Sequence, residues 1–471
     1  MKAFLFCLLV GLWALFPALG RAQTSSPSPL TGTWEGQIAL PNNLKLTVIL
    51  HITGDNAQQL AAKMDVPQQA AYGIAASHVA LQGTNVEVDF DVIHAHFTGT
   101  LSSDRKQIVG HWQQAGATLP LTLNKTDKPL SAAPKRPQEP APPYPYEVRD
   151  VSIPNPNAPG VTLSGTLTLP KGPGPFPAAL LIAGSGPNDR DENVFGHKIF
   201  LVLADYLTRH QIAVLRYDKR GVGKSTGDFA TATLQDFASD AVAVAQFLMH
   251  QPDINPKQVG LIGHSEGGIV APIVASQMPQ IAYVVLLAGP GMKGADLLAL
   301  QEERIAEAQG LPAEQIHKML EINKQLYQIV IEENDPQKAR TLMQEAIQKA
   351  QPKTKQEDMD RIISFLNTPW MHSFLAYDPT EALRKVHCPV LAVGGSKDLQ
   401  VPAKENLPLI KQALQQGGNR HVTTKVFPGL NHLFQPCQTG SPLEYAEIET
   451  TFDSKALAYI TQWIQGQIET N

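Results

Sequence analysis

The chain has 471 residues, of which 43% are hydrophobic and 17% charged. This composition provides apolar material for a large core and excludes general intrinsic disorder. Lysine and arginine number 38 against 43 aspartate and glutamate, so the formal net charge is −5 and no nucleic acid partner is expected. Of three cysteines only Cys388 and Cys437 lie beyond residue 30, which excludes a scaffold built on disulfides.

Residues 1–22 have the pattern of a cleaved signal peptide. Lys2 provides a positive start, residues 3–19 are an apolar stretch, and Gly20-Arg21-Ala22 places small residues before a cut after Ala22. A permanent membrane anchor is the alternative, although about 17 apolar residues are short for a span. The pattern predicts an exported, periplasmic or secreted protein with no stable membrane insertion after cleavage.

Residues 30–125 alternate apolar and polar side chains with a period of two, most clearly at 44–52 and 86–90. Turns containing Gly, Asn and Asp separate these runs, so we expect an antiparallel β-sandwich or barrel of about 95 residues. His94 and His96 are expected to project together from one strand. Two histidines without a third ligand indicate a solvated strand face rather than a metal site.

The segment 126–146 is rich in proline, with seven at positions 129, 134, 137, 140, 142, 143 and 145. Because proline fixes φ and lacks a backbone donor, such a segment does not join a sheet or a helix. The composition predicts a semi-rigid polyproline linker and a domain boundary.

From residue 147 to 471, short apolar runs alternate with helical segments such as 198–210 and 234–249. The runs show little alternation, as expected for parallel strands that are buried on both faces. They predict an α/β fold with an eight-stranded, mostly parallel sheet. The expected strands are residues 147–153, 162–169, 178–183, 212–216, 258–263, 283–288, 389–394 and 422–427.

About 100 residues separate the sixth and seventh of these strands, far more than one crossover helix requires. They are rich in Glu, Lys, Gln and Leu and show helical periodicity at 297–309 and 313–332. We expect a helical cap, at about residues 290–385, over the carboxyl edge of the sheet. The alternative is an appended helical subdomain that does not contact the site.

Gly263-His264-Ser265-Glu266-Gly267 matches the pattern G-x-S-x-G. It lies between an expected strand and an expected helix at 268–277, which is the context of a nucleophile elbow. Glycines on both sides of the serine allow the close backbone approach that so sharp a turn requires. Ser265 is therefore the candidate nucleophile.

A serine nucleophile needs a base and an acid that orients the base, and in this topology both follow the serine in the chain. Asp398 follows the strand at 389–394 and His432 follows the strand at 422–427, at the same sheet edge as Ser265. These three residues are the predicted catalytic triad. Five alternatives start at the opposite edge or lie in a helix: Asp378, Glu405, His372, His387 and His421.

Acyl transfer also needs backbone donors for the oxyanion. The N–H of Glu266, directly after the nucleophile, is one candidate. The other is expected in the loop Gly184-Ser185-Gly186-Pro187, where we assign the N–H of Ser185, with Gly186 as the near alternative. A plain glycine-rich turn is the interpretation without function.

The segment Gly221-Val222-Gly223-Lys224-Ser225 resembles the end of a phosphate-binding loop. That loop requires a glycine at the position that Asp218 occupies here. We therefore interpret the segment as a tight loop after the strand at 212–216 and expect no nucleotide partner.

Four motifs together resemble the α/β-hydrolase superfamily, and more narrowly a group of exported bacterial serine carboxylesterases related to acyl-peptide and Xaa-Pro peptidases. They are Gly-Ser-Gly-Pro-Asn-Asp-Arg-Asp-Glu at 184–192, Tyr-Asp-Lys-Arg-Gly-Val-Gly-Lys-Ser at 217–225, Gly-His-Ser-Glu-Gly-Gly at 263–268 and Gly-Leu-Asn-His at 429–432. The resemblance covers the chain from Tyr146 to the end and is more specific for fold and mechanism than for substrate. Many members have His where this chain has Ala183, so Asp189, Arg190 and Asp191 hold the loop as a buried ion network or form a solvated turn.

The resemblance and the triad imply a serine carboxylesterase that acts on small-molecule esters through an acyl-enzyme and needs no cofactor or metal. Alternatives on the same triad are a serine peptidase or acyl-aminoacyl hydrolase, a thioesterase and an acyltransferase. A binding protein with an inactive hydrolase domain is the alternative outside enzymes. The N-terminal region is too short for a propeller, which disfavours a prolyl peptidase of that type.

Two further groups of residues have no assigned role in the reaction: an aromatic cluster and two cysteines. Trp370, Met371, Phe374 and Tyr377 are candidate pocket walls or simply core. Cys388 and Cys437 are expected at opposite ends of a strand, too far apart for a disulfide, so we predict no bridge.

Overall fold

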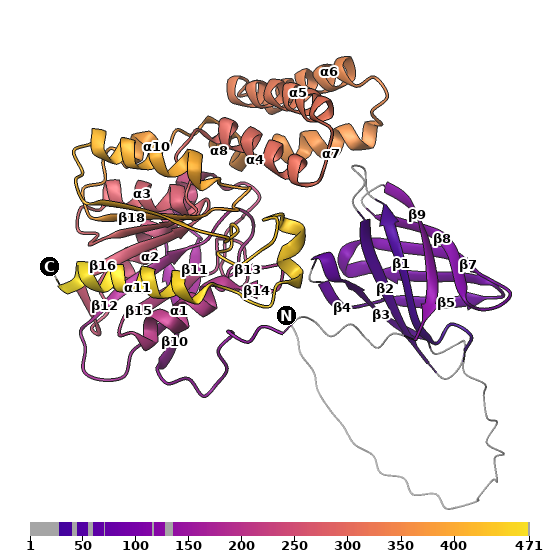
Figure 1. Ribbon diagram of the computed structural model, residues 1–471, viewed down its shortest axis with the longest axis horizontal. Helices are drawn as coiled ribbons and strands as arrows, with labels where there is room; N and C mark the ends of the chain where they lie inside the picture. The colour runs from indigo at the N-terminus through magenta and orange to yellow at the C-terminus, as the bar shows by residue number, and fades with distance from the viewer. Residues whose placement is uncertain are drawn as a thin grey trace, which may run out of the picture. The chain divides into compact units, whose positions relative to one another are not determined.

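The computed structural model describes residues 28–39, 45–54, 60–69, 71–114, 117–127 and 135–469 (Figure 1). These residues form two compact units, with most of the first before residue 130 and most of the second from Ser131 onward. The predicted signal peptide lies outside the described residues. Within the described ranges, no helix combines the length and the apolar character that crossing a membrane requires.

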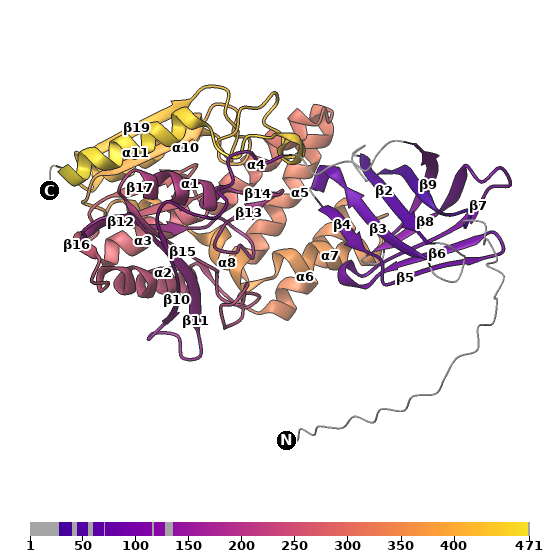
Figure 2. The same ribbon diagram turned by 90° about the horizontal axis from the view of Figure 1, so that it is seen from below.

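The strands of the N-terminal unit form one nine-stranded sheet in the order β4-β3-β2-β1-β9-β8-β7-β6-β5. The predicted all-β region is confirmed, as one curved sheet instead of two stacked sheets (Figures 1 and 2). Trp34, Phe90 and Phe97 are buried, as the alternation requires. The strands are β1 (Gly32–Ala39), β2 (Lys45–Thr53), β3 (Ala61–Val66), β4 (Ala71–Ala75), β5 (His78–Gln82), β6 (Asn85–Phe90), β7 (Ala95–Leu101), β8 (Gln107–Gln114) and β9 (Ala117–Thr126), with a 3-10 turn η1 (Pro67–Gln69) after β3.

The expectation that His94 and His96 project from one strand face is wrong. His94 ends the short 3-10 helix η2 (Asp91–Ile93) with a φ of 49°, so β7 begins only after it. His96 contacts the carboxylate of Asp89 on β6. In the part of the chain that the structure describes, no three His, Cys, Asp or Glu side chains are grouped to hold a metal ion.

The second unit is built on an eight-stranded sheet in the order β10-β11-β15-β12-β16-β17-β18-β19. β11 pairs antiparallel with both β10 and β15, and the pairs from β15 to β19 are parallel, as predicted. Parallel pairing brings the carboxyl ends of these strands to one edge of the sheet. The strands are β10 (Glu147–Pro154), β11 (Thr162–Leu169), β12 (Phe176–Ile182), β15 (Ala213–Tyr217), β16 (Ile254–His264), β17 (Val284–Leu287), β18 (Val390–Gly395) and β19 (Val422–Phe427), beside a hairpin of β13 (Asn193–Val194) and β14 (His197–Lys198).

Helices cover both faces of this sheet (Figure 1). α2, α3 and α10 pack into one apolar cluster, which includes Leu180 and Leu261 of the sheet. α1 and α11 pack into the other, with Leu181 and Ile262. Successive residues of one strand therefore enter opposite clusters, which explains why the strand sequences are apolar throughout. The helices are α1 (Ile199–Arg209), α2 (Leu234–Met249), α3 (Gly267–Gln277), α10 (Ala403–Gln416) and α11 (Ser454–Glu469).

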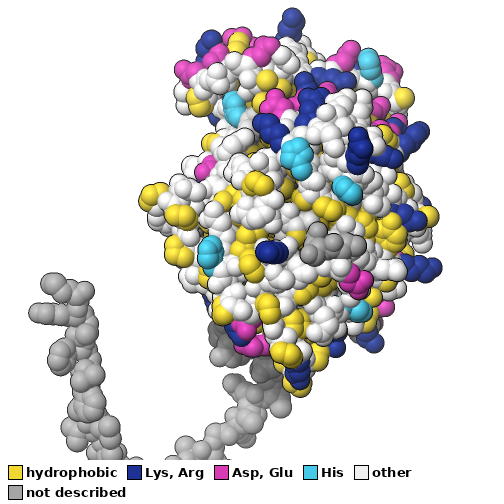
Figure 3. Space-filling model, turned by 90° about the vertical axis from the view of Figure 1, so that its left-hand side faces the viewer, with side chains coloured by type: hydrophobic (Ala, Val, Ile, Leu, Met, Phe, Trp, Pro, Cys, Tyr) yellow, Lys and Arg dark blue, Asp and Glu magenta, His cyan; other side chains and the backbone are white. Residues whose placement is uncertain are grey.

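The predicted cap consists of the helices between β17 and β18. Leu326, Met343 and Ile363 of the cap belong to the same apolar cluster as α2 and α3. In the view of Figure 3, acidic and basic side chains intermix on the cap. Lys318 and Glu314 of the cap form an ion pair at 2.6 Å. The cap helices are α4 (Gly294–Ala308), α5 (Ala313–Glu332), α6 (Pro336–Ala350), α7 (Gln356–Leu366), α8 (Pro369–Ala376) and α9 (Thr380–Leu383).

Cys388 and Cys437 are both free thiols. Burial raises the pKa of Cys388 to about 12 and that of Cys437 to about 11. Both side chains are therefore in the protonated, weakly reactive form at neutral pH.

The described end of the proline-rich segment, residues 135–146, joins no helix or strand and contacts other segments of the second unit. Arg136 donates to the carbonyl oxygens of Ile448 at 2.7 Å, Ala446 at 2.8 Å and Gly196 at 3.2 Å. Gln138 pairs with the backbone of Phe452 in both directions. Because the prolines keep this segment out of helices and strands, the side chains of Arg136 and Gln138 bind backbone groups of other segments. This strap joins the β13–β14 hairpin to the segment after the 3-10 helix η3 (Pro442–Glu447).

We expect Arg136→Ala to lower the free energy of unfolding by about 1–3 kcal/mol, because several carbonyl oxygens lose a charged donor. Urea unfolding of the full chain measures this change. Lys135→Ala, at the exposed neighbouring position, is the control and should change stability by less than about 0.5 kcal/mol. Equal effects of the two substitutions would contradict the importance of the strap.

Candidate active site

Ser265 lies at a sharp turn between the end of β16 and the start of α3, with a φ of 53°. A Cβ atom added at Gly263 would lie 2.0 Å from the carbonyl oxygen of Gly267, and one added at Gly267 would lie 1.9 Å from that of Ile182. Both glycines are therefore sterically required. The sequence forms the elbow at this point because no larger side chain fits on either side of the serine.

His432 and Asp398 form a buried pair at the same edge of the sheet. His432 Nδ1 lies 2.8 Å from Asp398 Oδ2, and their side chains are 5% and 0% exposed. The backbone N–H groups of Gln400 and Val401 donate to Asp398 Oδ1, each at 2.8 Å. These contacts orient the carboxylate, which in turn fixes the orientation of the imidazole.

His264, directly before Ser265, links the elbow to the His432 loop. Its Nε2 lies 3.1 Å from the carbonyl oxygen of His432, and its Nδ1 lies 2.8 Å from Glu192 Oε1. Burial alone would lower the pKa of His264, but the Glu192 carboxylate raises it above its usual value. Because a carbonyl and a carboxylate both accept, the imidazolium form satisfies both ring nitrogens. The elbow thus rests on a buried ion pair.

The loop after β12 carries the other predicted donor, Ser185. Its Gly184 N–H donates to Glu192 Oε1 at 2.6 Å, and the Asn188 side chain donates to the carbonyl oxygens of Gly184 and Ser185, each at 2.8 Å. Among the described residues, no acceptor is bound to the backbone N–H of Ser185 or of Glu266. Both donors are therefore available, and Gly186, with a φ of 92°, remains the near alternative.

A second buried ion pair joins Lys219 to Glu266. Lys219 Nζ lies 2.7 Å from Glu266 Oε1 and 2.5 Å from the carbonyl oxygen of Gly184. The indole N–H of Trp370, on cap helix α8, donates to Glu266 Oε2. The Lys219 and Glu266 side chains are only 5% and 1% exposed. One carboxylate therefore connects a cation under the Ser185 loop with the cap.

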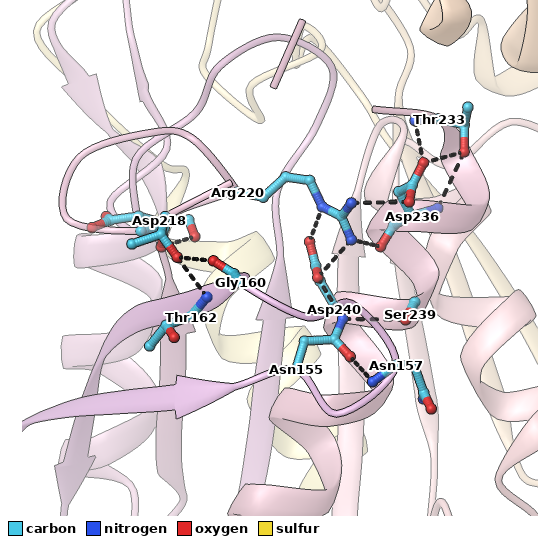
Figure 4. Close-up of polar contacts among 12 residues, drawn as sticks. Asn155, Asn157, Gly160, Thr162, Asp218, Arg220, Thr233, Asp236, Ser239 and Asp240 are labelled. Atoms are coloured by element: carbon cyan, nitrogen blue, oxygen red, sulfur yellow. Dashed lines mark hydrogen bonds and ion pairs between the residues drawn. The ribbon is translucent and has the colours of Figure 1, made fainter. Parts of the chain in front are cut away.

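The loop that carries Lys219 is fastened to α2 by its neighbour Arg220 (Figure 4). Arg220 pairs with Asp240 at 2.7 Å and with Asp236 at 2.9 Å. Asp236 also closes a capping box with Thr233 at the start of α2, and Asn155 donates to Asp240 at 2.7 Å. Figure 4 shows the guanidinium between the two carboxylates. These contacts hold the start of the loop rigid.

The glycines that resemble a phosphate-binding loop surround a carboxylate of the protein itself. Asp218 Oδ2 accepts from the N–H of Lys224 at 3.2 Å, and a Cβ at Gly223 would lie 2.6 Å from the same oxygen. Arg190 also pairs with Asp218 at 2.8 Å, with side chains 15% and 5% exposed. Of the two interpretations of residues 189–191, the structure therefore shows the ion network, in which Asp191 also contacts Arg216.

A cavity of about 550 Å³ contains Ser265 in its wall. Ser185, Gly186 and Glu266 line it from the sheet side, and α4, α7 and α8 line it from the cap, so the cap contacts the site. Tyr377 packs in the core and does not line the cavity. His432 and Asp398 are buried and are not among the lining residues. The apolar lining side chains are Pro187, Phe229, Ala230, Pro290, Leu297, Leu298, Phe365, Trp370, Met371, Phe374 and Val401.

The reasoning from sequence missed the buried partners around the elbow: Glu192, Lys219 and the side-chain roles of His264 and Glu266. His264 and Glu266 occupy the two variable positions of G-x-S-x-G, which the motif leaves unspecified. Lys219 lies in the motif at 217–225, which indicates the superfamily but gives this lysine no role of its own. The available signal for Lys219 was its position between an apolar strand and a glycine-rich loop. A charged residue there is expected to be buried, and a buried charge almost always has a partner.

Comparison with known proteins places this arrangement among hydrolases. The sequence profile of the family described as serine aminopeptidase, S33, matches residues 197–435. The Esterase EstD of Thermotoga maritima is 26% identical over 324 residues, which cover 68% of each chain. An esterase of Pyrococcus furiosus has a TM-score of 0.41 at 15% identity, over 68% of this chain and 91% of that one. A hypothetical protein of Pseudomonas aeruginosa has a TM-score of 0.43 at 16% identity, over 73% and 100%.

A mostly parallel sheet with a serine at a strand–turn–helix elbow and a helical cap defines an α/β hydrolase, and the predicted fold class is confirmed. The profile match spans just over half of the 471 residues. The chain therefore belongs to the serine aminopeptidase S33 family and is a serine hydrolase.

The buried pair of His264 and Glu192 predicts a pH-dependent contribution to stability. A histidine with a raised pKa stabilises the fold below its unfolded value of about 6.5 and loses that contribution as pH rises through its folded value. We expect Glu192→Gln to lower the free energy of unfolding by about 2–4 kcal/mol near pH 5.5. The deficit relative to wild type should shrink as pH rises to 9.

Urea unfolding at several pH values between 5 and 9 measures this difference. Glu147→Gln, which removes the carboxylate of an exposed pair with Arg149, serves as the control and should give a small, nearly flat difference. A Glu192→Gln deficit that stays constant or grows with pH would refute the assignment of charge to His264.

Proposed function

We propose that this protein hydrolyses carboxylic esters through an acyl-enzyme on Ser265, with His432 as the base and Asp398 as the residue that orients it. The observation that carries the proposal is the 2.8 Å contact of His432 with Asp398, at the sheet edge where Ser265 lines a cavity. The Ser265 turn and the His432 loop are also linked directly, because His264 precedes Ser265 and its side chain contacts the backbone of His432.

Each step of the reaction has a residue to perform it. With Nδ1–H donated to Asp398, Nε2 of His432 is the basic nitrogen and takes the proton of Ser265 as the oxygen attacks the ester carbonyl. The imidazolium then protonates the departing alkoxide, leaving the acyl group on Ser265. Water, deprotonated by His432, releases the acid and restores the serine. Asp398 stabilises the imidazolium in both halves.

The tetrahedral intermediates carry a negative oxygen that needs fixed donors. The N–H groups of Ser185 and Glu266 have no acceptor among the described residues, and both residues line the cavity beside Ser265. We assign these two groups to the oxyanion hole. The loop that carries the Ser185 donor is already held in place by Asn188 and Glu192, so this donor costs little reorganisation during the reaction.

The charge of the cavity favours esters over peptides with a free amino terminus. An aminopeptidase must bind an ammonium group, which requires an available carboxylate or a similar acceptor. Of the described lining residues only Glu266 ionises, and its carboxylate is already paired with Lys219 and Trp370. The name of the Thermotoga maritima relative, an esterase, supports the same choice. The description of the S33 family keeps aminopeptidase activity as the second candidate.

The substrate that fits best is a neutral ester with an apolar portion. The cavity of about 550 Å³ is lined mainly by aliphatic and aromatic side chains. Burial of each methylene group there contributes about 0.8 kcal/mol, so the cap should discriminate between esters by chain length.

The central test uses p-nitrophenyl esters of graded acyl length beside aminoacyl anilides. We expect ester turnover that falls by at least about 10³-fold in Ser265→Ala and about 10³- to 10⁴-fold in Asp398→Asn, as for other triads. Ser276→Ala, near the end of the helix α3 that follows Ser265, is the matched control and should keep wild-type kcat. Hydrolysis of anilides without hydrolysis of esters would sink the esterase proposal, and turnover that survives Ser265→Ala would sink the site.

A second test concerns the cap. Leu298→Trp, on α4, fills part of the cavity, so kcat/KM for octanoyl esters should fall about tenfold or more while acetyl esters change little. The profile of kcat/KM against chain length measures this shift. Equal losses for short and long esters would show that the cavity does not hold the apolar portion.

A further inference from the structure

We propose that Lys219 is a positioning residue for catalysis, because it holds together the two halves of the oxyanion hole. This inference rests on the proposed function, which assigns the oxyanion donors to Ser185 and Glu266. It gives Lys219 a role that reaches beyond the triad, through groups that themselves contact the reacting oxygen.

The first half of the oxyanion hole is attached to Lys219 through a peptide group. Lys219 Nζ donates to the carbonyl oxygen of Gly184 at 2.5 Å. That carbonyl and the N–H of Ser185 belong to the same planar amide, so fixing the oxygen fixes the direction of the N–H. A cation on the carbonyl also polarises the amide and makes its N–H a stronger donor, because linked hydrogen bonds reinforce one another.

The second half is attached through a carboxylate. Glu266 offers its backbone N–H to the oxyanion, and its Oε1 lies 2.7 Å from Lys219 Nζ. The same ammonium group therefore contacts both segments that carry the donors. Trp370 of the cap donates to the other oxygen, Oε2, so the position of Glu266 also depends on the cap.

The surroundings make Lys219 a fixed group. Its side chain is 5% exposed, and Nζ lies 4.5 Å from the ring centroid of Phe237. Its backbone N–H donates to the carbonyl oxygen of Asn188, in the loop that it supports. The next residue, Arg220, is locked to Asp236 and Asp240 (Figure 4). An ammonium group held this way in a low-dielectric site acts more strongly than one in water.

The competing explanation is that Lys219 only neutralises the buried Glu266. Two substitutions separate the explanations. Lys219→Met leaves an unpaired carboxylate, which could simply destabilise the fold. Lys219→Met combined with Glu266→Gln removes both charges, keeps an acceptor for Trp370 and keeps the backbone N–H of residue 266. If Lys219 were a counter-ion only, the double variant would be as active as Glu266→Gln.

The experiment compares wild type, Glu266→Gln and the double variant. It measures thermal unfolding, kcat and KM on a short p-nitrophenyl ester, and inhibition by a trifluoromethyl ketone with the same acyl chain as that ester. The Ser265 oxygen adds to the carbonyl of this ketone and gives a tetrahedral adduct with a negative oxygen. The affinity for the ketone therefore measures how well the oxyanion hole stabilises that oxygen. Relative to Glu266→Gln, we expect the double variant to lose about 10- to 100-fold in kcat with KM within threefold. Its affinity for the ketone should fall by a similar factor, while its Tm stays within a few degrees.

Lys224→Met, an exposed change on the same loop, is the control and should leave all four measurements at wild-type values. A double variant with kcat and ketone affinity within threefold of Glu266→Gln would overturn the inference and leave the proposed function intact. A loss confined to KM would overturn it as well. Absence of ester turnover in the wild-type protein would instead overturn the proposed function, and the inference with it.

Discussion

The close approach of three backbone segments at Ser265 is the constraint on which the rest of the site depends. Gly263 and Gly267 allow β16, α3 and the end of β12 to come so near that a single Cβ would collide with a carbonyl oxygen. The resulting turn holds Ser265 at a φ of 53° and places both Ser265 and Glu266 in the wall of the cavity. Such strain persists only where the surrounding structure over-determines the backbone. Here parallel strands on both sides of β16 fix the position of the turn.

Two buried ion pairs support this turn from either side. Glu192 with His264 ties it to the backbone of His432, and Lys219 with Glu266 ties it to the loop of Ser185. Buried pairs seldom add much net stability, because both partners lose their hydration. Each pair instead fixes the relative orientation of segments that are far apart in sequence. The proposed acyl transfer requires such positioning, because a misplacement of about 1 Å can cost about 10²-fold in rate. The charges also leave no free carboxylate among the described residues of the cavity wall, which makes the cavity neutral.

The sequence was sufficient to predict those elements whose pattern follows from local chemistry. Buried parallel strands, the elbow glycines and the helical insertion have signatures of composition and spacing, and the predicted eight-stranded, mostly parallel sheet agrees with the observed one. Asp398 and His432 could be placed because strand ends determine which edge a loop occupies. Lys219 and Glu192 could not, since their partners depend on how three loops meet in space. The contacts of the proline-rich segment could not be predicted for a related reason. Arg136 binds carbonyl groups about 60 and 310 residues away, and no local pattern indicates such contacts.

The central claim is that Ser265 forms a covalent acyl intermediate during ester hydrolysis. Its most direct test is acid-quenched mass spectrometry of the protein within the first turnovers on a p-nitrophenyl ester, followed by mapping of the modified peptide. The account predicts a mass increase of one acyl group, located on the peptide that contains Ser265 and absent from Ser265→Ala. An acyl group on another residue, or product formation in a rapid burst with no adduct at all, would contradict it.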